Sequence, residues 1–288
     1  MLLSSTFEWS RVWDQLPDLL GKLPVTLELA VVAMLISLIL GLLVAIVRIK
    51  KIPVLTQIAK IYLSVIRGTP MIIQLYVAYY GVPIILTAFG VDIQVIRQIP
   101  KILYAFLALG VYQSAFTSET IRAAFISVNK GEIEAAHAMG MNYFQILFKI
   151  IIPEAAEVAV PGLVNSLIGL IKGTSLAFTC GVIEITAQAQ IISGRTYRYL
   201  EGYVALAIIY WIITFIIEQF LKVLEKKISI PDQVGKNKPN KFILFFKKVL
   251  KKKEIEAKIL NENDEENTDE ENSLDNSLQE GAEANAWN

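Results

Sequence analysis

Cysteine and histidine are nearly absent from this 288-residue sequence, which contains one of each, Cys180 and His137. A single cysteine can form neither a disulfide framework nor a multi-cysteine metal site within one chain. A single histidine leaves no HExxH pair and no His/Cys cluster, so the sequence argues against metal-dependent chemistry. We therefore expect no metal site and no cofactor held by this chain, and His137 is expected to be an ordinary surface residue.

Charge is also scarce, because charged side chains make up 19% of the residues and 27 basic residues balance 27 acidic ones. This balance argues against a general nucleic-acid binder. A GxxxxGK[ST] phosphate loop is missing, since Gly21-Lys22 is followed by Leu23 and Gly235-Lys236 by Asn237. The chain is therefore not expected to hydrolyse ATP by that route.

Hydrophobic side chains are abundant, at 54% of the residues, and the mean hydropathy is +0.50. A bilayer-crossing helix needs about 20 mainly apolar residues, because its backbone amides find no water in the hydrocarbon core. These values predict an all-α integral membrane protein with five transmembrane helices. The predicted spans are residues 24–47, 70–90, 102–118, 158–185 and 203–221. The fourth is expected to be broken, because Pro161, Lys172 and Gly173 interrupt it and an irregular or half-helical piece follows.

Basic residues predict how the chain crosses the cell membrane. Lys50 and Lys51 follow the first span, Lys226 and Lys227 follow the last, and such residues favour the cytoplasmic side. With five spans, the N-terminus is then outside and the C-terminus inside. Residues 9–20 before the first span form an amphipathic opening, and nothing suggests a cleaved signal sequence.

The sequence divides into a membrane domain, residues 1–230, and a cytoplasmic tail, residues 231–288. Lys236 to Lys253 is basic with apolar residues at helical spacing, which suits a helix lying on anionic membrane lipid. From Asn261 to Asn288 the tail is acidic and rich in Asn, Ser and Glu, a composition typical of disorder. The simpler alternative is that this charged run is a solvated tail without a partner.

The loop between the third and fourth spans has the most informative pattern. Asn129 followed by Glu132 predicts a capping box at the start of a helix over residues 132–139. Gly140 fits the end of that helix, because glycine adopts the left-handed conformation readily. Its alanines make the helix thin enough for another protein surface to approach closely. A second amphipathic stretch, residues 143–152, is expected to close at Pro153.

This loop resembles the cytoplasmic signature of the permease subunits of binding-protein-dependent ATP-binding-cassette importers, in the polar amino acid branch. That signature is Glu-Ala-Ala, three residues, Gly, nine residues, and an apolar pair ahead of Pro. The matching residues are Glu134, Ala135, Ala136, Gly140, Ile150, Ile152 and Pro153. Further matches are Arg67-Gly68-Thr69-Pro70, Glu119 with Arg122, and Lys172 with Thr174-Ser175-Leu176. The resemblance covers residues 16–230, and two departures are Gly173, commonly Asp in this branch, and Phe116, frequently Tyr.

The resemblance implies partners as well as a fold. Glu134, Ala135, Ala136 and Gly140, with Ile150 and Pro153, are expected to form a coupling helix and its flank that dock on a separate ATPase subunit, which binds the ATP. An extracytoplasmic solute-binding protein would deliver the cargo, and a second permease chain, identical or a sister, would complete the pore. The cargo is expected to be a polar amino acid, and several local strings look closest to cystine-type members. An ordinary surface helix between two spans is the plainer alternative for the loop.

A substrate path is expected from polar residues in or beside the apolar spans. The candidates are Arg67, Thr69, Gln74, Glu119, Lys172, Thr174 and Ser175. Four of them have a structural alternative. Glu119 and Arg122 are three residues apart and could simply pair, Lys172 could extend to the interface, Gln74 could join helices, and Thr69 could cap the helix that begins at Pro70.

Two other functions stay open at this point. One is a self-contained secondary transporter or channel, which would transport without any ATPase, although five spans are few for the larger transporter folds. The other is a membrane scaffold or enzyme, and against the enzyme stands the lack of any nucleophile and base with recognisable spacing.

Overall fold

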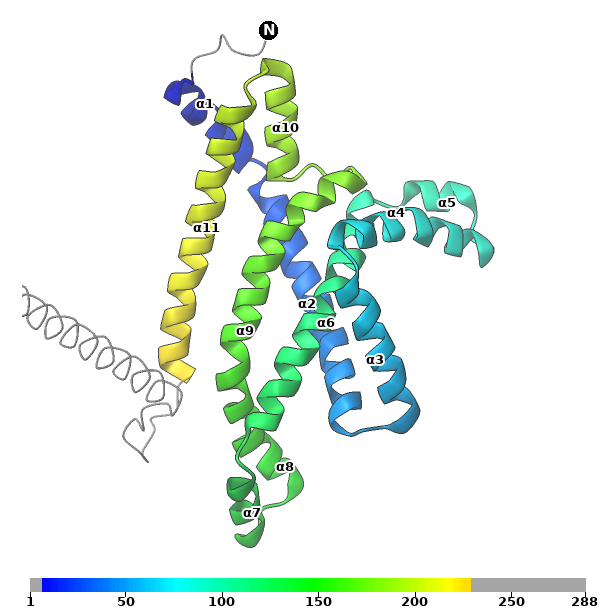
Figure 1. The fold of residues 1–288 in the computed structure, drawn as a ribbon, viewed down its shortest axis with the longest axis vertical. Helices are drawn as coiled ribbons and strands as arrows, with labels where there is room; N and C mark the ends of the chain where they lie inside the picture. The colour runs from blue at the N-terminus through cyan, green and yellow to red at the C-terminus, as the bar shows by residue number, and fades with distance from the viewer. Residues whose placement is uncertain (1–6, 229–288) are drawn as a thin grey trace, which may run out of the picture. The chain divides into compact units, whose positions relative to one another are not determined.

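A computed structural model describes residues 7–228 of the chain, and the predicted tail lies outside these residues. Regular structure in this part is entirely helical (Figure 1), which confirms the all-α fold. The elements are α1 (Trp9–Leu20), α2 (Leu23–Ile49), α3 (Pro53–Gly68), α4 (Met71–Ala88), α5 (Ile93–Gln98), α6 (Lys101–Ser127), α7 (Lys130–Ala138), α8 (Tyr143–Ile146), the π-helical turn η1 (Leu147–Ile151), α9 (Ile152–Gly173), the 3₁₀ helix η2 (Thr174–Cys180), α10 (Ile185–Thr196) and α11 (Tyr199–Ile228).

Three of these helices are long and apolar enough to cross a membrane, namely α2, α4 and residues 199–223 of α11. The segments 143–180 and 185–196, bent by 55° at a short break, could make a fourth crossing. The predicted span 102–118 lies inside α6, which is 27 residues long and more polar. The count of five spans and the outward-facing N-terminus stay predictions.

The core forms where α2, α6 and α9 lie side by side (Figure 1). Small residues let α2 and α6 approach closely, as they do between helices in membranes. A methyl group placed on Gly110 would lie 2.6 Å from Cγ2 of Ile36, and the hydroxyls of Ser37 and Thr117 are 3.3 Å apart across the same contact. Leu29, Leu109 and Leu170, one from each helix, are fully buried here.

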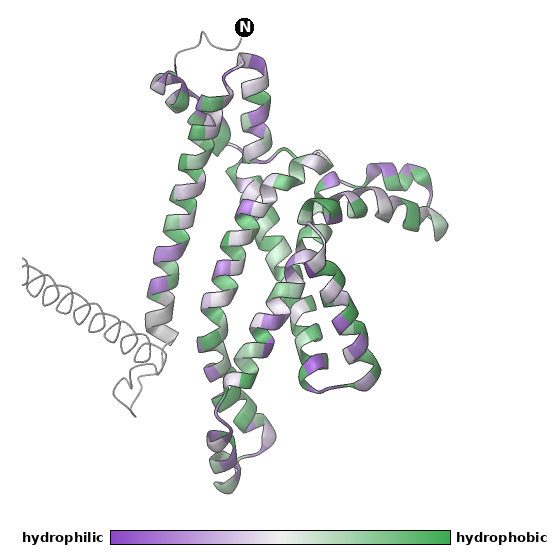
Figure 2. Ribbon diagram, in the orientation of Figure 1, coloured by the Kyte–Doolittle hydropathy of each residue, from purple (hydrophilic) through white to green (hydrophobic). Residues whose placement is uncertain are grey.

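The amphipathic opening is α1, which begins and ends at the predicted residues. Its buried face carries Val12 and Leu19 and packs against Ala205 and Ile209 of α11. Figure 2 shows hydrophilic residues in α10 and α7, which Figure 1 places at opposite ends of the bundle.

The structure corrects three expectations about helix ends. Pro153 does not close a helix, because α8, η1 and α9 form one helical run from residue 143 to 173. Within η1 the N–H of Ile152 donates to the carbonyl of Leu147, and this wider turn accommodates a proline that has no N–H of its own. The fourth span is not interrupted at Pro161 or Lys172 either, and the irregular piece begins only at Thr174. Finally, residues 53–68 form a helix, α3, where none was predicted.

Candidate coupling surface and translocation cavity

The predicted coupling helix is α7, and its first turn differs in detail from the expectation. Asn129 is the N-cap, and its side chain accepts a hydrogen bond from the N–H of Gly131 at 2.9 Å. The reciprocal capping box lies one helix later, where Asn142 and Gln145 exchange two hydrogen bonds of 2.9 Å. Asn129 therefore caps α7 as predicted, but the box with Glu132 is wrong, and the segment at Tyr143 has a well-defined start of its own.

Gly140 ends α7 as predicted. Its φ of +80° lies in the left-handed region, which glycine adopts without strain. The N–H of Met141 donates to the carbonyl of Ala136 at 3.1 Å, and that of Gly140 donates to His137 at 2.9 Å. These two bonds are the Schellman arrangement, which satisfies the last carbonyls of the helix and turns the chain sharply into α8.

The signature residues divide between two faces. Ala136 is buried, whereas Glu134, Ala135 and Gly140 are exposed. Further along, Ile150 is partly buried and Pro153 is exposed. The first alanine thus lies on the exposed surface of α7, and the second packs α7 against its own chain.

The outer face of this region also carries large apolar side chains that the signature does not include. These exposed residues are Met139, Tyr143, Phe144 and Phe148. Tyr143 and Phe144 stack edge to face, with ring centroids 5.8 Å apart. Exposed apolar groups gathered in one place are typical of a protein or membrane contact. We call Ala135, Met139, Tyr143, Phe144 and Phe148 the outer apolar face. Periodicity gave an amphipathic stretch here, but only the fold shows which residues face outward.

Two predicted path residues, Thr69 and Gln74, lie together at the junction of α3 and α4. The Thr69 hydroxyl donates to the carbonyl of Val65 at 2.9 Å, and Nε2 of Gln74 donates to Thr69 Oγ1 at 2.7 Å and to the carbonyl of Ile66 at 2.8 Å. These bonds satisfy carbonyls left free where α3 ends. Thr69 therefore closes α3 instead of capping α4, whose N-cap is Pro70.

Glu119 lies at the centre of a cluster of arginines from three helices. Its carboxylate accepts from Arg48 of α2 and from Nε of Arg122 of α6 at 3.0 Å, and Nη1 of Arg67 of α3 is 3.9 Å away. Arg67 also lies over the ring of Phe116, 5.4 Å from its centroid. One negative charge facing three positive ones leaves the cluster cationic, and the predicted Glu119 and Arg122 pair is present.

The remaining predicted path residues lie in the last turn of α9 and the first residues of η2. Lys172 is exposed. The hydroxyl of Thr174 donates to the carbonyl of Ile171 at 2.7 Å, and that of Ser175 donates to Lys172 at 2.8 Å. Both hydroxyls bond backward to their own backbone, so this geometry supports the passage into η2.

A cavity with a volume of about 400 Å³ lies between α4, α6 and α9, and none of the seven predicted path residues lines it. Its lining residues are Met71, Tyr112, Gln113, Phe116, Gly162, Asn165, Ser166 and Gly169. The polar groups among them are uncharged, and Phe116 connects the cavity wall to Arg67. The sequence offered one signal, two glycines seven residues apart in a span with Asn165 and Ser166 between them, but the partners on α4 and α6 come from distant parts of the chain.

Among residues 7–228, no group of three or more His, Cys, Asp or Glu side chains could hold a metal ion.

Comparison with known proteins shows which family the chain belongs to. Residues 27–230 match the family described as "Binding-protein-dependent transport system inner membrane component". The chain belongs to this family of transport permeases.

Individual relatives of the permease are close in sequence. It is 37% identical over 227 residues to the "Probable amino-acid permease protein YxeN" of Bacillus subtilis, with 79% of this chain and 98% of the relative covered. It is 40% identical over 205 residues to the "Probable amino-acid ABC transporter permease protein PatM" of Vibrio harveyi, covering 71% and 89%. The "L-cystine transport system permease protein TcyL" of Bacillus subtilis is 34% identical over 227 residues, covering 79% and 94%.

Comparison with solved structures supports the same family. A crystal structure described as an amino acid ABC transporter with histidines matches with a TM-score of 0.67 and 32% identity, covering 77% of this chain and all of that one. The MetNI methionine transporter in an inward-facing form matches with a TM-score of 0.60 and 20% identity over 75% of this chain and 99% of that one, which supports the fold alone. The permease is thus a multi-pass protein of the cell membrane, related to the polar amino acid branch.

Proposed function

We propose that this permease is the membrane subunit of an ATP-driven importer that carries a polar amino acid into the cell. The outer apolar face beside α7 is the observation that carries this proposal. In it, Ala135 and the aromatic rings of Tyr143, Phe144 and Phe148 lie exposed on a helix pair directly joined to α6 and α9.

The physical role of this region is to transmit motion. Gly140 fixes the turn between α7 and α8, and the buried Ala136 and Ile146 hold both against the chain. A rigid helical segment of this kind transmits a rigid-body displacement to the helices that it joins, here α6 and α9. The partner is an ATPase subunit, which holds the ATP and hydrolyses it, so this chain contributes motion of its helices and no catalysis.

The cavity between α4, α6 and α9 is the proposed place of the cargo in this chain. Tyr112, Gln113, Asn165 and Ser166 offer hydrogen-bond donors and acceptors without charge, which suits a zwitterion whose own charges cancel. Among the predicted path residues, Arg67 lies over the ring of Phe116, which lines this cavity. L-cystine is the first cargo to test, since two cystine permeases of Bacillus subtilis, TcyL and TcyB, are 34% and 36% identical to this chain.

Two further partners follow from the family description. A solute-binding protein delivers the amino acid on the outer side, and a second permease chain, the same or a sister, completes the pore. Both would meet surfaces of this chain other than the outer apolar face.

The test substitutes one residue of the outer apolar face and one exposed signature residue of α7, and it measures ATPase binding and amino acid uptake separately. Phe144→Ser and Glu134→Lys are expected to reduce co-purification of the ATPase and uptake together. Leu200→Ser is the matched control, because Leu200 is 63% exposed against 68% for Phe144 and lies at the start of α11. ATPase binding and uptake that persist in both variants would overturn the docking assignment, and uptake by the purified permease without any ATPase would overturn the ATP-driven mechanism.

A further inference from the structure

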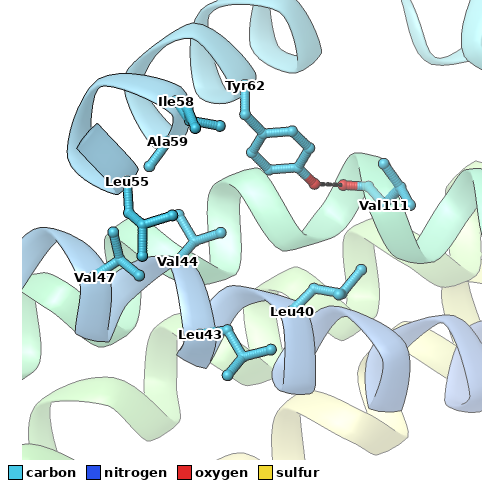
Figure 3. Close-up of a pocket in the computed structure, with 9 residues that line it drawn as sticks. All are labelled: Leu40, Leu43, Val44, Val47, Leu55, Ile58, Ala59, Tyr62 and Val111. Atoms are coloured by element: carbon cyan, nitrogen blue, oxygen red, sulfur yellow. Dashed lines mark hydrogen bonds between the residues drawn. The ribbon is translucent and has the colours of Figure 1, made fainter. Parts of the chain in front are cut away.

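An apolar groove lies between the antiparallel helices α2 and α3. It has a volume of about 360 Å³ and is open to the surface. Val44 and Val47 of α2 face Leu55 and Ile58 of α3, and Val111 of α6 lies at its floor (Figure 3). Its lining is aliphatic except for the ring of Tyr62.

The polar atom of Tyr62 is turned away from this groove. Its hydroxyl donates to the carbonyl of Val111 at 3.0 Å, drawn in Figure 3, and lies 2.6 Å from Oγ of Ser114. A buried hydroxyl that already has hydrogen-bond partners in the protein needs none from a ligand. The groove therefore suits a hydrocarbon chain and offers little to a polar solute.

A basic turn connects the two helices that line the groove. Lys50 and Lys51 connect α2 to α3, both are exposed, and they lie three and four residues beyond Val47 in the sequence. The turn is tight, because Lys51 has a φ of 52° and the N–H of Ile52 donates to the carbonyl of Val47 at 3.3 Å. The two exposed lysines thus lie in the turn that joins Val47, the last lining residue of α2, to Leu55, the first lining residue of α3.

We propose that this groove and its basic turn form a binding site for one anionic phospholipid. The acyl chain lies between α2 and α3, and the headgroup phosphate meets Lys50 and Lys51. Charge complementarity selects this occupant, since basic pockets between membrane helices bind anionic headgroups, whereas a second protein helix would leave the two lysines without an anion.

The test uses the purified full-length chain and titrates it with phosphatidylglycerol and phosphatidylcholine that carry identical acyl chains, with bound lipid counted by native mass spectrometry. Phosphatidylglycerol is expected to bind more tightly, and its advantage is expected to fall with added salt, because exposed charges are screened. Lys50→Gln with Lys51→Gln should lower the advantage about 25-fold, since a basic residue near an anionic membrane contributes about 1 kcal/mol, or roughly fivefold.

A matched pair of variants tests the groove itself. Ile58→Trp fills it, and Ile61→Trp places the same side chain on α3 outside it, at a residue 65% exposed against 56% for Ile58. Ile58→Trp should reduce retention of both lipids, and Ile61→Trp should leave it unchanged. Equal binding of the two lipids by the unsubstituted protein at low salt would overturn the proposal. Equal retention by both tryptophan variants, or a lipid-free dimer cross-linked through the groove, would overturn it as well.

Discussion

Gly169 gives the sharpest test of the translocation cavity. It lies inside α9 and lines the cavity, and a methyl group placed on it would meet no atom within 4 Å. Replacing a glycine in a helix by alanine stabilises the fold by about 0.5–1 kcal/mol. For a protein of this size that corresponds to a rise in melting temperature of about 1–4 °C. Gly169→Ala should therefore be more stable than the unsubstituted permease.

A larger side chain at the same residue should separate stability from transport. Gly169→Leu projects into a cavity of about 400 Å³ and competes with the cargo for space. Overpacking costs about 1–3 kcal/mol, which is roughly a 5- to 150-fold loss of apparent affinity for the cargo. Gly162→Ala is the contrast, because its methyl group would lie 2.8 Å from Cγ2 of Thr120 and should lower the melting temperature.

The assay pairs thermal unfolding in detergent with amino acid uptake by the complete transporter in vesicles. The expected pattern for Gly169→Leu is a normal or raised melting temperature with strongly reduced uptake. Normal uptake together with a normal melting temperature would refute the reasoning, because the cavity could then be filled without obstructing the cargo.

Two further predictions concern the contacts that hold the helices. Gly110→Ala should lower the free energy of unfolding by about 1–2 kcal/mol, because overpacking against Ile36 outweighs a gain of about 0.5–1 kcal/mol in helix propensity. Gly81→Ala, whose methyl group would meet Val77 at 3.9 Å, should keep the gain. Denaturant unfolding measures both variants, and equal effects would contradict the close approach of α2 and α6. Glu119→Gln should lower the free energy of unfolding by about 1–2 kcal/mol, since it removes the anion shared by three arginines. Partial exposure of the side chains, 27% for Glu119 and 18% for Arg48, reduces this effect. An unchanged free energy of unfolding would show that the cluster contributes nothing to stability.

Local signals in the sequence predicted several elements correctly. The bounds of α1 follow from an amphipathic repeat, and the end of α7 follows from Gly140, because a left-handed residue is a local requirement of the backbone. The expected helix end at Pro153 and the expected interruption at Pro161 were wrong for a physical reason. Proline breaks an isolated helix, but in α9 a wider turn and the packing of neighbouring helices accommodate it.

The predicted path residues show where such reasoning stops. Polar side chains in apolar spans were selected because burying them is costly, yet Thr69, Gln74, Thr174 and Ser175 meet that cost by bonding nearby backbone. Thr69 and Gln74 also line a second, mainly apolar cavity of about 400 Å³ between α3, α4 and α6. Which contacts a polar group makes depends on rotamers and neighbours, which a linear pattern does not encode.

The sequence by itself determined that this chain is an apolar helical permease with a coupling signature, because hydropathy and the spacing of Glu134, Ala135, Ala136 and Gly140 are properties of consecutive residues. Only the tertiary structure decided which side chains meet across the chain. Phe116 joins Arg67 to a cavity shared with α9, and α2 and α3 enclose an apolar groove beside a basic turn. Each of these sites brings together side chains from different helices, so it exists only once the helices have packed.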